Sequence, residues 1–310
     1  MTQVTILIVN WNGREWLESL MPTLETQTFP AFDIVVVDNG STDGSCAWLA
    51  QHWPQVRVIA LSENVGFAKA NNVGIDATNA PFVLALNNDT LPEPQFVAEM
   101  VNGMADAAVG MVAARVVQWQ DATLLDSAGI DVNQFGMAFQ RGWGDSAENH
   151  TTPQQIFGPS GAAALYRREM LDEIGRFDET FFAYYEDVDL AWRAQRAGWR
   201  CQYQPTAIVK HWHSATGNRV TNLKLRLLSR NKWLTLAKNL DRRQILLLGA
   251  QIGAVDVAAM LVRSVQSRTL LPIRSRIAAW QRWQRLRRDR MPSKQRVPLA
   301  SVFRSIRDLS

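Results

Sequence analysis

Short apolar runs alternate with helix-patterned segments through residues 4–86, and this alternation restricts the fold more than any other feature of the chain. The runs are continuous rather than interrupted by polar residues, so both faces of each strand are expected to be buried. Strands are predicted at 4–9, 34–37, 56–60 and 82–86. Helices are predicted at 14–25, at 45–52 and in a segment that ends at Ala77. The order predicts an α/β fold, with a mostly parallel, twisted sheet and helices on both faces.

A cluster of polar residues follows each of these strands. The clusters are Asn10–Gly13, Asp38–Gly44, Glu63–Gly66 and Asn87–Asp89. Ligands of a parallel sheet bind at the carboxyl ends of its strands, which share one edge. A turn alone would explain one such cluster, because Asn and Asp tolerate left-handed backbone. Four clusters at the same edge indicate a binding site.

A second group of candidates lies in Phe181–Leu190, where aromatic residues precede the carboxylates of Glu186, Asp187 and Asp189. This segment is predicted to open a helix that Gly198 ends. The carboxylates would gain a few tenths to ~1 kcal/mol each from the helix dipole, so a solvated first turn is one interpretation. The aromatic neighbours favour a pocket wall, where burial raises a carboxyl pKa and can produce a general base.

A metal site is the third candidate feature. Asp89 follows the fourth predicted strand, and His211 and His213 follow a strand predicted at 207–209. A carboxylate and an imidazole at one rim can hold Mg²⁺ or Mn²⁺ together with the oxygens of a diphosphate. By itself Asp89 would be explained as a turn or cap, and a lone histidine as structural. The pattern leaves open which of the two histidines would bind.

Several common chemistries are absent from the sequence. There is no dinucleotide-binding glycine motif, no Gly-Lys-Ser/Thr phosphate loop and no Gly-x-Ser-x-Gly nucleophile motif. The two cysteines, Cys46 and Cys201, are far apart, which favours a reduced, cytoplasmic environment. The first residues lead straight into a strand, so no secretory leader is expected. The stretch 245–262 contains Gln251 and Asp256 and is a poor candidate for a membrane span.

The net charge of +4 conceals a division along the chain. Residues 1–218 contain 12 Lys and Arg against 25 Asp and Glu, whereas residues 219–310 contain 21 against 4. Two domains are therefore predicted: an acidic catalytic domain, 1–218, and a basic helical C-terminal extension, 219–310. The extension is expected to meet an anionic surface, with nucleic acid and membrane phospholipid as the candidates.

The end of the extension mixes arginine with apolar residues. Arginines and tryptophans alternate over Trp280, Arg282, Trp283, Arg285, Leu286, Arg287, Arg288 and Arg290. This combination suits a membrane–water interface. A solvated helix face and an oligomer contact are equally acceptable interpretations.

Six segments of residues 4–217 resemble one family closely. The segments are VTILIVNWNGREWL, DIVVVDNGSTDGS, ENVGFAKANNVGI, LALNNDT, GPSGAAALYRREMLDEIGRFDETFFAYYEDVDLAWRAQRAGW and HWHSATG. They resemble, in the same order, the family 2 glycosyltransferases of the GT-A fold, and in particular the rhamnosyltransferase-like bacterial branch. The combination is specific for the family and weakly specific for the sugar transferred.

The resemblance implies roles for the rim residues. The first loop and the end of the second strand would hold the nucleotide base and ribose, through Asn10, Asn12 and Asp38, with Asn64 and Gly66 flanking them. Asn87-Asn88-Asp89 would occupy the Asp-x-Asp site of the family, with Asn87 standing where many relatives have Asp. Asp89 would bind the metal. His211 matches the late metal-binding histidine better than His213, although the shortened spacing to Thr216-Gly217 leaves the choice open.

The resemblance also implies the catalytic group and the reaction. Glu186 and Asp187 match the family's Glu-Asp motif, with Asp187 as the general base. Gly161, Tyr185 and Asp189 are expected on the acceptor side, with a structural role as the alternative for Asp189. The chain is thus expected to be an inverting, Mg²⁺- or Mn²⁺-dependent glycosyltransferase.

The donor and acceptor are narrower expectations. The resemblance favours transfer of rhamnose from dTDP-rhamnose to a glycan or lipid-linked glycan, in the cytoplasm and peripherally on the inner face of the cell membrane. A UDP-hexose or UDP-N-acetylhexosamine donor is the alternative within the family. A nucleic-acid-binding protein acting through residues 240–310 is the alternative of another class. That alternative leaves the acidic rim unexplained, so no nucleic acid is expected as a partner.

Overall fold

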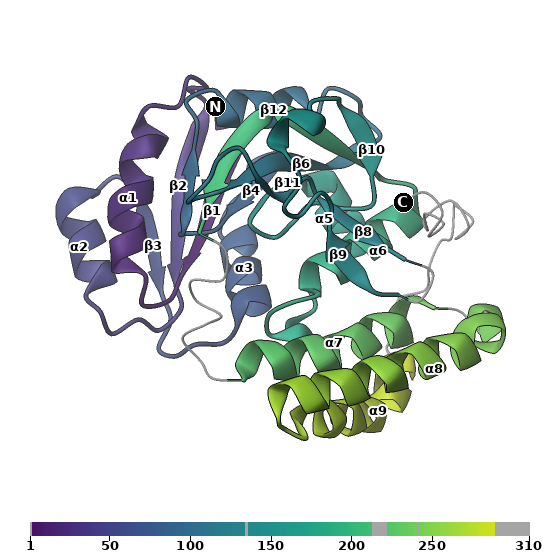
Figure 1. Ribbon diagram of the computed structural model, residues 1–310. Coiled ribbons are helices and arrows are strands. Elements are labelled where there is room, and N and C mark those ends of the chain that lie inside the picture. The colour runs from purple at the N-terminus through teal and green to yellow at the C-terminus, as the bar shows by residue number, and fades with distance from the viewer. Residues whose placement is uncertain (1, 134–135, 213–221, 241, 289–310) are drawn as a thin grey trace.

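A central sheet with helices on both faces forms the body of the molecule, and the last helices lie together beside it (Figure 1). The structure is a computed structural model that describes residues 2–133, 136–212, 222–240 and 242–288. Within these residues the main sheet has ten strands, of which eight follow the order β10-β12-β6-β11-β4-β1-β2-β3, while β5 pairs with β12 and β7 with β6. The strands are β1 Val4–Asn10, β2 Phe32–Asp38, β3 Arg57–Ala60, β4 Phe82–Leu86, β5 Thr90–Pro92, β6 Val109–Gln118, β7 Leu125–Ser127, β10 Gln154–Ile156, β11 Ala163–Arg167 and β12 Arg200–His211. A separate hairpin joins β8 Ile130–Val132 and β9 Ala138–Gln140.

The centre of the sheet is parallel, as predicted from the continuous apolar runs. β1 pairs in parallel with both β2 and β4, and β2 pairs in parallel with β3. β12 is likewise parallel to β6. β11 lies antiparallel between β4 and β6 and joins the two parallel groups. The carboxyl ends of β1, β2, β3 and β4 therefore meet at one edge of the sheet.

Neighbouring residues of each central strand enter opposite cores. Ile6 and Ile8 contact one core, and Leu7 between them contacts the other. The core that contains Ile6 and Ile8 is covered by α1 Arg14–Glu25, α2 Ser45–His52 and α4 Phe96–Asn102. The core that contains Leu7 is covered by α3 Phe67–Asp76, α5 Arg168–Ile174 and α6 Glu186–Ala197. Burial of apolar side chains on both faces explains why the strands lack polar alternation.

The observed bounds agree with the predicted ones in α1 and α2, and the helix predicted to end at Gly198 does end there, with φ of 94° at that glycine. At its start, the carboxylates of Glu186, Asp187 and Asp189 lie in the first turn, as the sequence indicated, but the aromatic residues from Phe181 to Tyr185 lie outside the helix. Residues 179–181 form a short 3-10 helix, η2 Glu179–Phe181, and α6 begins only at Glu186. Between them Phe182, Tyr184 and Tyr185 have positive φ, which breaks the helical pattern.

The C-terminal extension contains α7 Leu223–Asn239, α8 Arg242–Ser267 and α9 Leu271–Arg288. Leu236, Leu240 and Ile252 are part of the same apolar core as the sheet. The division at residue 218 therefore stays a prediction based on charge, while the packing of α7 is continuous with the body. In the described part of the chain, no helix has both the length and the apolar character needed to cross a membrane.

Candidate active site

The polar clusters after β1, β2 and β4 are bonded to one another at the sheet edge. Asn10 Nδ2 donates to Asp38 Oδ1 (3.0 Å), and Asn10 Oδ1 accepts from Asn88 Nδ2 (2.8 Å). All three side chains are buried. A Cβ on Gly13 would lie 2.2 Å from Asn88 Nδ2, so the first loop passes this close only because residue 13 is glycine. Asn10 and Asn88 therefore fix the ends of three strands relative to one another.

Asn12 connects the first loop to the loop after β2. Its backbone has φ of 49°, and its N–H donates to Ser41 Oγ (2.8 Å). Its Oδ1 accepts from Thr42 N (2.7 Å), and Asp38 Oδ2 accepts from Ser41 N (3.0 Å). The structure thus brings Asn12 and Asp38 together through the Ser41–Thr42 backbone.

Asn39 lies in the predicted polar cluster Asp38–Gly44 but was not singled out there as a site residue. Its Nδ2 donates to Asn64 Oδ1 (3.1 Å), and its Oδ1 accepts from Val65 N (2.9 Å). Gly66 follows with φ of 93°, and a Cβ there would lie 2.5 Å from the Phe182 ring. Asn39 therefore ties the loops after β2 and β3 together beside the turn that precedes α6.

A cavity of about 420 Å³ opens at this edge of the sheet. The predicted site residues that line it are Asn64, Asn87, Asn88, Asp89, Gly161, Tyr185, Glu186, Asp187 and His211. Those that do not line it are Asn10, Asn12, Asp38, Gly66 and Asp189. The cavity therefore unites the Asn87–Asp89 and Glu186–Asp187 segments, while Asn10, Asn12 and Asp38 are not among the residues that line it.

Asp89 and His211 are brought together by the pairing of β5 with β12, which sets Thr90 opposite His211. His211 Nε2 lies 3.3 Å from Asp89 Oδ1, and Nδ1 lies 2.8 Å from Asp126 Oδ2. Burial lowers the pKa of His211, but Asp126 and Asp89 outweigh that effect and raise the pKa to about 9. Asp126 was also missed, because β7 is too short to recognise in the sequence.

The chemistry of these groups fits a divalent ion. A metal-binding histidine commonly gives its second ring nitrogen to a carboxylate, and Asp126 stands in that position to His211. The described residues contain no cluster of three or more His, Cys, Asp or Glu gathered as ligands. Asp89 and His211 would therefore need substrate or water oxygens to complete the coordination. His213, Thr216 and Gly217 lie outside the described residues.

Glu186 and Asp187 have different surroundings although they are adjacent. Asp187 Oδ2 accepts from Gly161 N (3.1 Å), and Oδ1 accepts from Val188 N (2.8 Å). Glu186 is 5% exposed, and its Oε2 has no hydrogen-bond partner within the described residues. Burial raises the pKa of both carboxyls, and the Asp187 charge raises that of Glu186 further. The two N–H donors favour the ionised form at Asp187, so the shared proton belongs on Glu186.

Asp189 faces away from the cavity, toward α7. It is 0% exposed and accepts from Arg193 Nε (2.9 Å), Lys238 Nζ (2.8 Å) and Asn239 Nδ2 (2.9 Å). Burial opposes ionisation, but Lys238 and Arg193 outweigh it and lower the pKa of Asp189 to about 2. These contacts favour the structural role that was the alternative for Asp189 over a position on the acceptor side.

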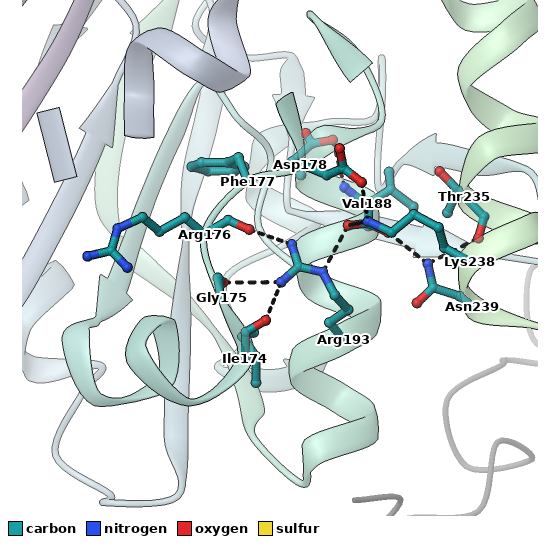
Figure 2. A network of polar contacts seen from close by, with 12 residues as sticks. Ile174, Gly175, Arg176, Phe177, Asp178, Val188, Arg193, Thr235, Lys238 and Asn239 are labelled. Atoms are coloured by element: carbon teal, nitrogen blue, oxygen red, sulfur yellow. Dashed lines mark hydrogen bonds and ion pairs between the residues drawn. The ribbon is translucent and has the colours of Figure 1, made fainter. Parts of the chain in front are cut away.

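Arg193 extends this network to the segment before η2 (Figure 2). Its guanidinium donates to the carbonyl oxygens of Ile174 (2.7 Å), Gly175 (3.1 Å) and Arg176 (2.7 Å). The same Lys238 ammonium that bonds Asp189 also lies 2.6 Å from Asp178 Oδ2. The network therefore joins α6, α7 and the segment that precedes η2.

Solved structures share this architecture. The chain matches GalNAc-T7 solved with UDP, GalNAc and Mn²⁺, with a TM-score of 0.57 and 13% identity over 77% of this chain and 50% of that one. It matches residues 1–349 of Staphylococcus aureus TarS in complex with UDP, with a TM-score of 0.53 and 16% identity over 78% of this chain and 68% of that one. The chain thus spans about half the length of the GalNAc-T7 chain, and the likeness establishes a GT-A type fold.

The sequence model of glycosyl transferase family 2 matches residues 5–175, and the chain belongs to this family. It is 28% identical, over 66% of this chain and 75% of the relative, to the N-acetylglucosaminyl-diphospho-decaprenol L-rhamnosyltransferase of Mycobacterium tuberculosis. It is 25% identical, over 83% of this chain and 84% of the relative, to a low-salt glycan biosynthesis hexosyltransferase of Haloferax volcanii. The protein is accordingly an enzyme of glycosyl transfer.

Proposed function

We propose that this glycosyltransferase moves a sugar from a nucleotide-diphosphate donor to a hydroxyl acceptor, with inversion and with the help of a divalent metal ion. The observation that carries the proposal is that Asp187 and the Asp89–His211 pair border one cavity. An inverting transfer needs a base for the acceptor hydroxyl and positive charge at the leaving diphosphate. The two groups supply these functions without a covalent intermediate.

The metal would lie at Asp89 and His211. Either Mg²⁺ or Mn²⁺ suits one carboxylate, one imidazole and the oxygens of a diphosphate. When bound, the ion would neutralise charge on the leaving group. Asp126 would hold the His211 ring in the orientation that leaves Nε2 facing Asp89.

Asp187 would act as the general base. Its carboxylate is aimed along the cavity wall by the N–H groups of Gly161 and Val188. Its raised pKa makes it a stronger base than an ordinary aspartate while the donors keep it available as a carboxylate. Tyr185 and Gly161 border the same part of the cavity and would face the acceptor.

The donor is proposed to be dTDP-rhamnose. Support comes from relatives named as rhamnosyltransferases, in Mycobacterium tuberculosis and, at 22% identity over 69% of this chain, in Salmonella typhimurium. A UDP-hexose or UDP-N-acetylhexosamine is the second candidate, because the hexosyltransferase relative and the UDP complex of TarS are equally compatible with the family. The acceptor is proposed to be a glycan or a lipid-linked glycan.

A panel of donors tests these proposals. Thermal unfolding would be followed with dTDP-rhamnose, UDP-hexoses and UDP-N-acetylhexosamines, each with and without Mn²⁺. A true donor is expected to raise the Tm, and to do so more strongly with the metal, because a ligand that binds only the folded state stabilises it. The anomeric configuration of a transfer product, read by NMR, then tests inversion. Retention of the donor's anomeric configuration in the product would contradict an inverting mechanism with Asp187 as the single base.

The surface of the extension supports an anionic membrane as the place of action. In residues 246–266 the charged residues are Asp256, which is buried against Lys232 and Arg276, and Arg263. The outer side of α8 instead exposes large apolar side chains, namely Leu246, Val257, Leu261, Val262 and Val265. Contiguous apolar surface on a protein commonly marks a membrane or protein contact.

Charge favours lipid as the partner of this surface. Residues 219–310 carry a formal charge of +17, from 21 Lys and Arg against 4 Asp, so a second copy of the extension would be repelled. An anionic leaflet would be attracted by the same charge. The side chains of Trp280 and of residues 282–288 lie outside the described residues, as does Arg290.

A further inference from the structure

The turn between η2 and α6 has a costly backbone conformation. Phe182, Tyr184 and Tyr185 have φ of 67°, 66° and 73°. Bulky side chains disfavour this region, and residues stay in it only where surrounding contacts hold them there. The turn leads directly into Glu186 and Asp187, and Tyr184 and Tyr185 themselves border the cavity. The positions of Glu186 and Asp187 therefore depend on the contacts that hold the turn.

A single amide on α7 supplies the main contacts to the turn. Asn231 is 0% exposed, and its Nδ2 lies 2.9, 2.8 and 2.6 Å from the carbonyl oxygens of Phe181, Ala183 and Tyr184. Its Oδ1 accepts from Arg230 Nε (2.8 Å), which orients the nitrogen toward the turn. Three carbonyl oxygens of the turn thus share the two N–H groups of one buried amide.

Arg230 reinforces the same contact from the outer side. Its Nη2 donates to the carbonyl oxygens of Thr180 (3.0 Å) and Phe181 (2.8 Å). On the opposite side of the turn, Phe182 O accepts from Ala68 N (3.1 Å) at the start of α3. The turn is therefore held between α7 and the loop that carries Gly66.

We propose that Asn231, assisted by Arg230, is a positioning residue for the transfer reaction. The clamp on the carbonyls of residues 181–184 holds the left-handed turn and so sets Glu186 and Asp187 on the cavity wall. α7 belongs to the C-terminal extension, so the extension completes the catalytic site through this contact; α7, Glu186 and Asp187 all lie beyond residues 5–175, which the family model matches. The catalytic part of this inference rests on the function proposed above.

Asn231→Ala is the principal variant, and Asn239→Ala is its matched control. Asn239 lies on the same helix, is also buried and donates to Asp189 Oδ1 (2.9 Å) and Thr235 O (3.0 Å), and neither of these bonds involves the turn. Arg230→Met is a milder variant that weakens the clamp from a partly exposed position. It decides the comparison if Asn231→Ala does not fold.

The expected kinetic result is a loss of kcat with donor KM nearly unchanged. A displaced base costs on the order of 100-fold in rate, so Asn231→Ala should lose about that much relative to Asn239→Ala at a similar change in Tm. Arg230→Met should lose less in the same direction. Equal kcat in the control and in both clamp variants would overturn the positioning role.

Hydrogen exchange supplies a readout that needs no activity. Exchange of the backbone amides in residues 181–187, followed by mass spectrometry, should speed up in Asn231→Ala and Arg230→Met and stay at the wild-type rate in Asn239→Ala. Unchanged exchange in the two clamp variants would overturn the clamp itself. If the wild-type chain shows no sugar transfer, the proposed function fails while the exchange result still decides whether Asn231 holds the turn.

Discussion

Asp187 and Glu186 are adjacent carboxyls whose surroundings predict opposite roles. Asp187 accepts two backbone N–H bonds, whereas Glu186 Oε2 has none within the described residues. Asp187→Asn is therefore expected to lose transfer by several orders of magnitude while donor binding survives, because only the base is removed. Glu186→Gln, which mimics a protonated Glu186, is the matched control and should retain most of the kcat. Near-normal turnover in Asp187→Asn would remove Asp187 from the mechanism.

The pH dependence of the reaction tests the same pair. Asp187 accepts a proton only as the carboxylate, and burial raises its pKa above the ordinary aspartate range. The protonated, inactive form therefore persists to higher pH than for an exposed aspartate. A plot of kcat/KM against pH should rise through an apparent pKa above about 3.9. This apparent pKa belongs to Glu186 and Asp187 as a coupled pair. An acid limb at or below the ordinary aspartate value would contradict the buried-base assignment.

The metal proposal predicts a specific pattern of losses at Asn87–Asp89. Asp89→Ala should weaken metal-dependent donor binding in calorimetry, and excess chelator should abolish activity, because the ion loses its carboxylate in one case and is removed in the other. Asn87→Asp should be tolerated, since residue 87 borders the cavity and Asp is the commoner residue there in the family that the sequence resembles. Full activity in excess chelator would show that the enzyme is metal-independent and that Asn87–Asp89 form only a turn.

The residues that could be predicted are those at strand and helix ends. Asp89 follows a recognisable strand end, Asp187 matches the Glu-Asp motif near a helix start, and both line the cavity. Asp126 and Asn231 could not be predicted in the same way. Their importance comes from contacts with residues 85 and 47–50 positions away, and such distances have no local pattern.

At the scale of elements, α6 shows where the sequence pattern was insufficient. Its end at Gly198 follows from the tolerance of glycine for left-handed backbone, and this was predictable. Its start was not, because aromatic residues at 182, 184 and 185 have no intrinsic preference for positive φ. Contacts from α7 override local propensity there, and those contacts become visible only in the folded chain.

The attachment of α6 to α7 predicts a measurable loss of stability. Lys238→Met removes one cation from Asp189, whose side chain is 0% exposed, so unfolding should cost about 3 kcal/mol less at pH 7. Glu18→Gln, in the exposed Arg14–Glu18 pair, is the control and should change the unfolding free energy by under about 1 kcal/mol. Urea unfolding measures both. Equal changes in the unfolding free energy would show that the buried network around Asp189 stabilises the fold no more than the exposed Arg14–Glu18 pair does.

The pH dependence of that stability has a defined sign. The pKa of Asp189 is lowered to about 2 in the folded chain and is about 3.9 when unfolded. Its contribution is therefore fully present above the unfolded pKa and is lost as the pH falls through the folded value, between roughly pH 4 and 2. Asp189→Asn should flatten the urea-unfolding profile in this window, and an unaltered profile would contradict the assignment.

At the scale of the whole molecule, the acidic body and the basic extension are joined rather than separate. Lys238 bonds Asp178 and Asp189 of the body, and Asn231 bonds the turn before α6. The charge division at residue 218 was visible in the sequence, but this interlocking was not. Part of the positive charge of residues 219–310 is thus used within the fold, and the remainder is available to an external partner.

The final prediction is that the outer side of α8 docks the enzyme on an anionic membrane. Leu246 and Val265 are 84% and 77% exposed, and Arg268, directly after α8, and Arg274, in α9, are exposed as well. Inserted apolar side chains would gain about 25 cal/mol per Å² buried, and each basic residue near the lipid about 1 kcal/mol. Co-sedimentation of the full chain with anionic vesicles should therefore be strong, and weak with neutral ones.

Two double variants separate insertion from charge alone. Leu261→Glu with Val265→Glu should abolish sedimentation with anionic vesicles, because charged side chains resist entry into the bilayer interface. Gln51→Glu with Gln55→Glu changes the net charge equally on the exposed end of α2 and the loop after it, and should sediment like the wild-type chain. Equal sedimentation of both variants would show that α8 is not the docking surface. Salt-sensitive binding of the wild-type chain to DNA or RNA, with no vesicle binding, would instead favour nucleic acid as the partner of the extension.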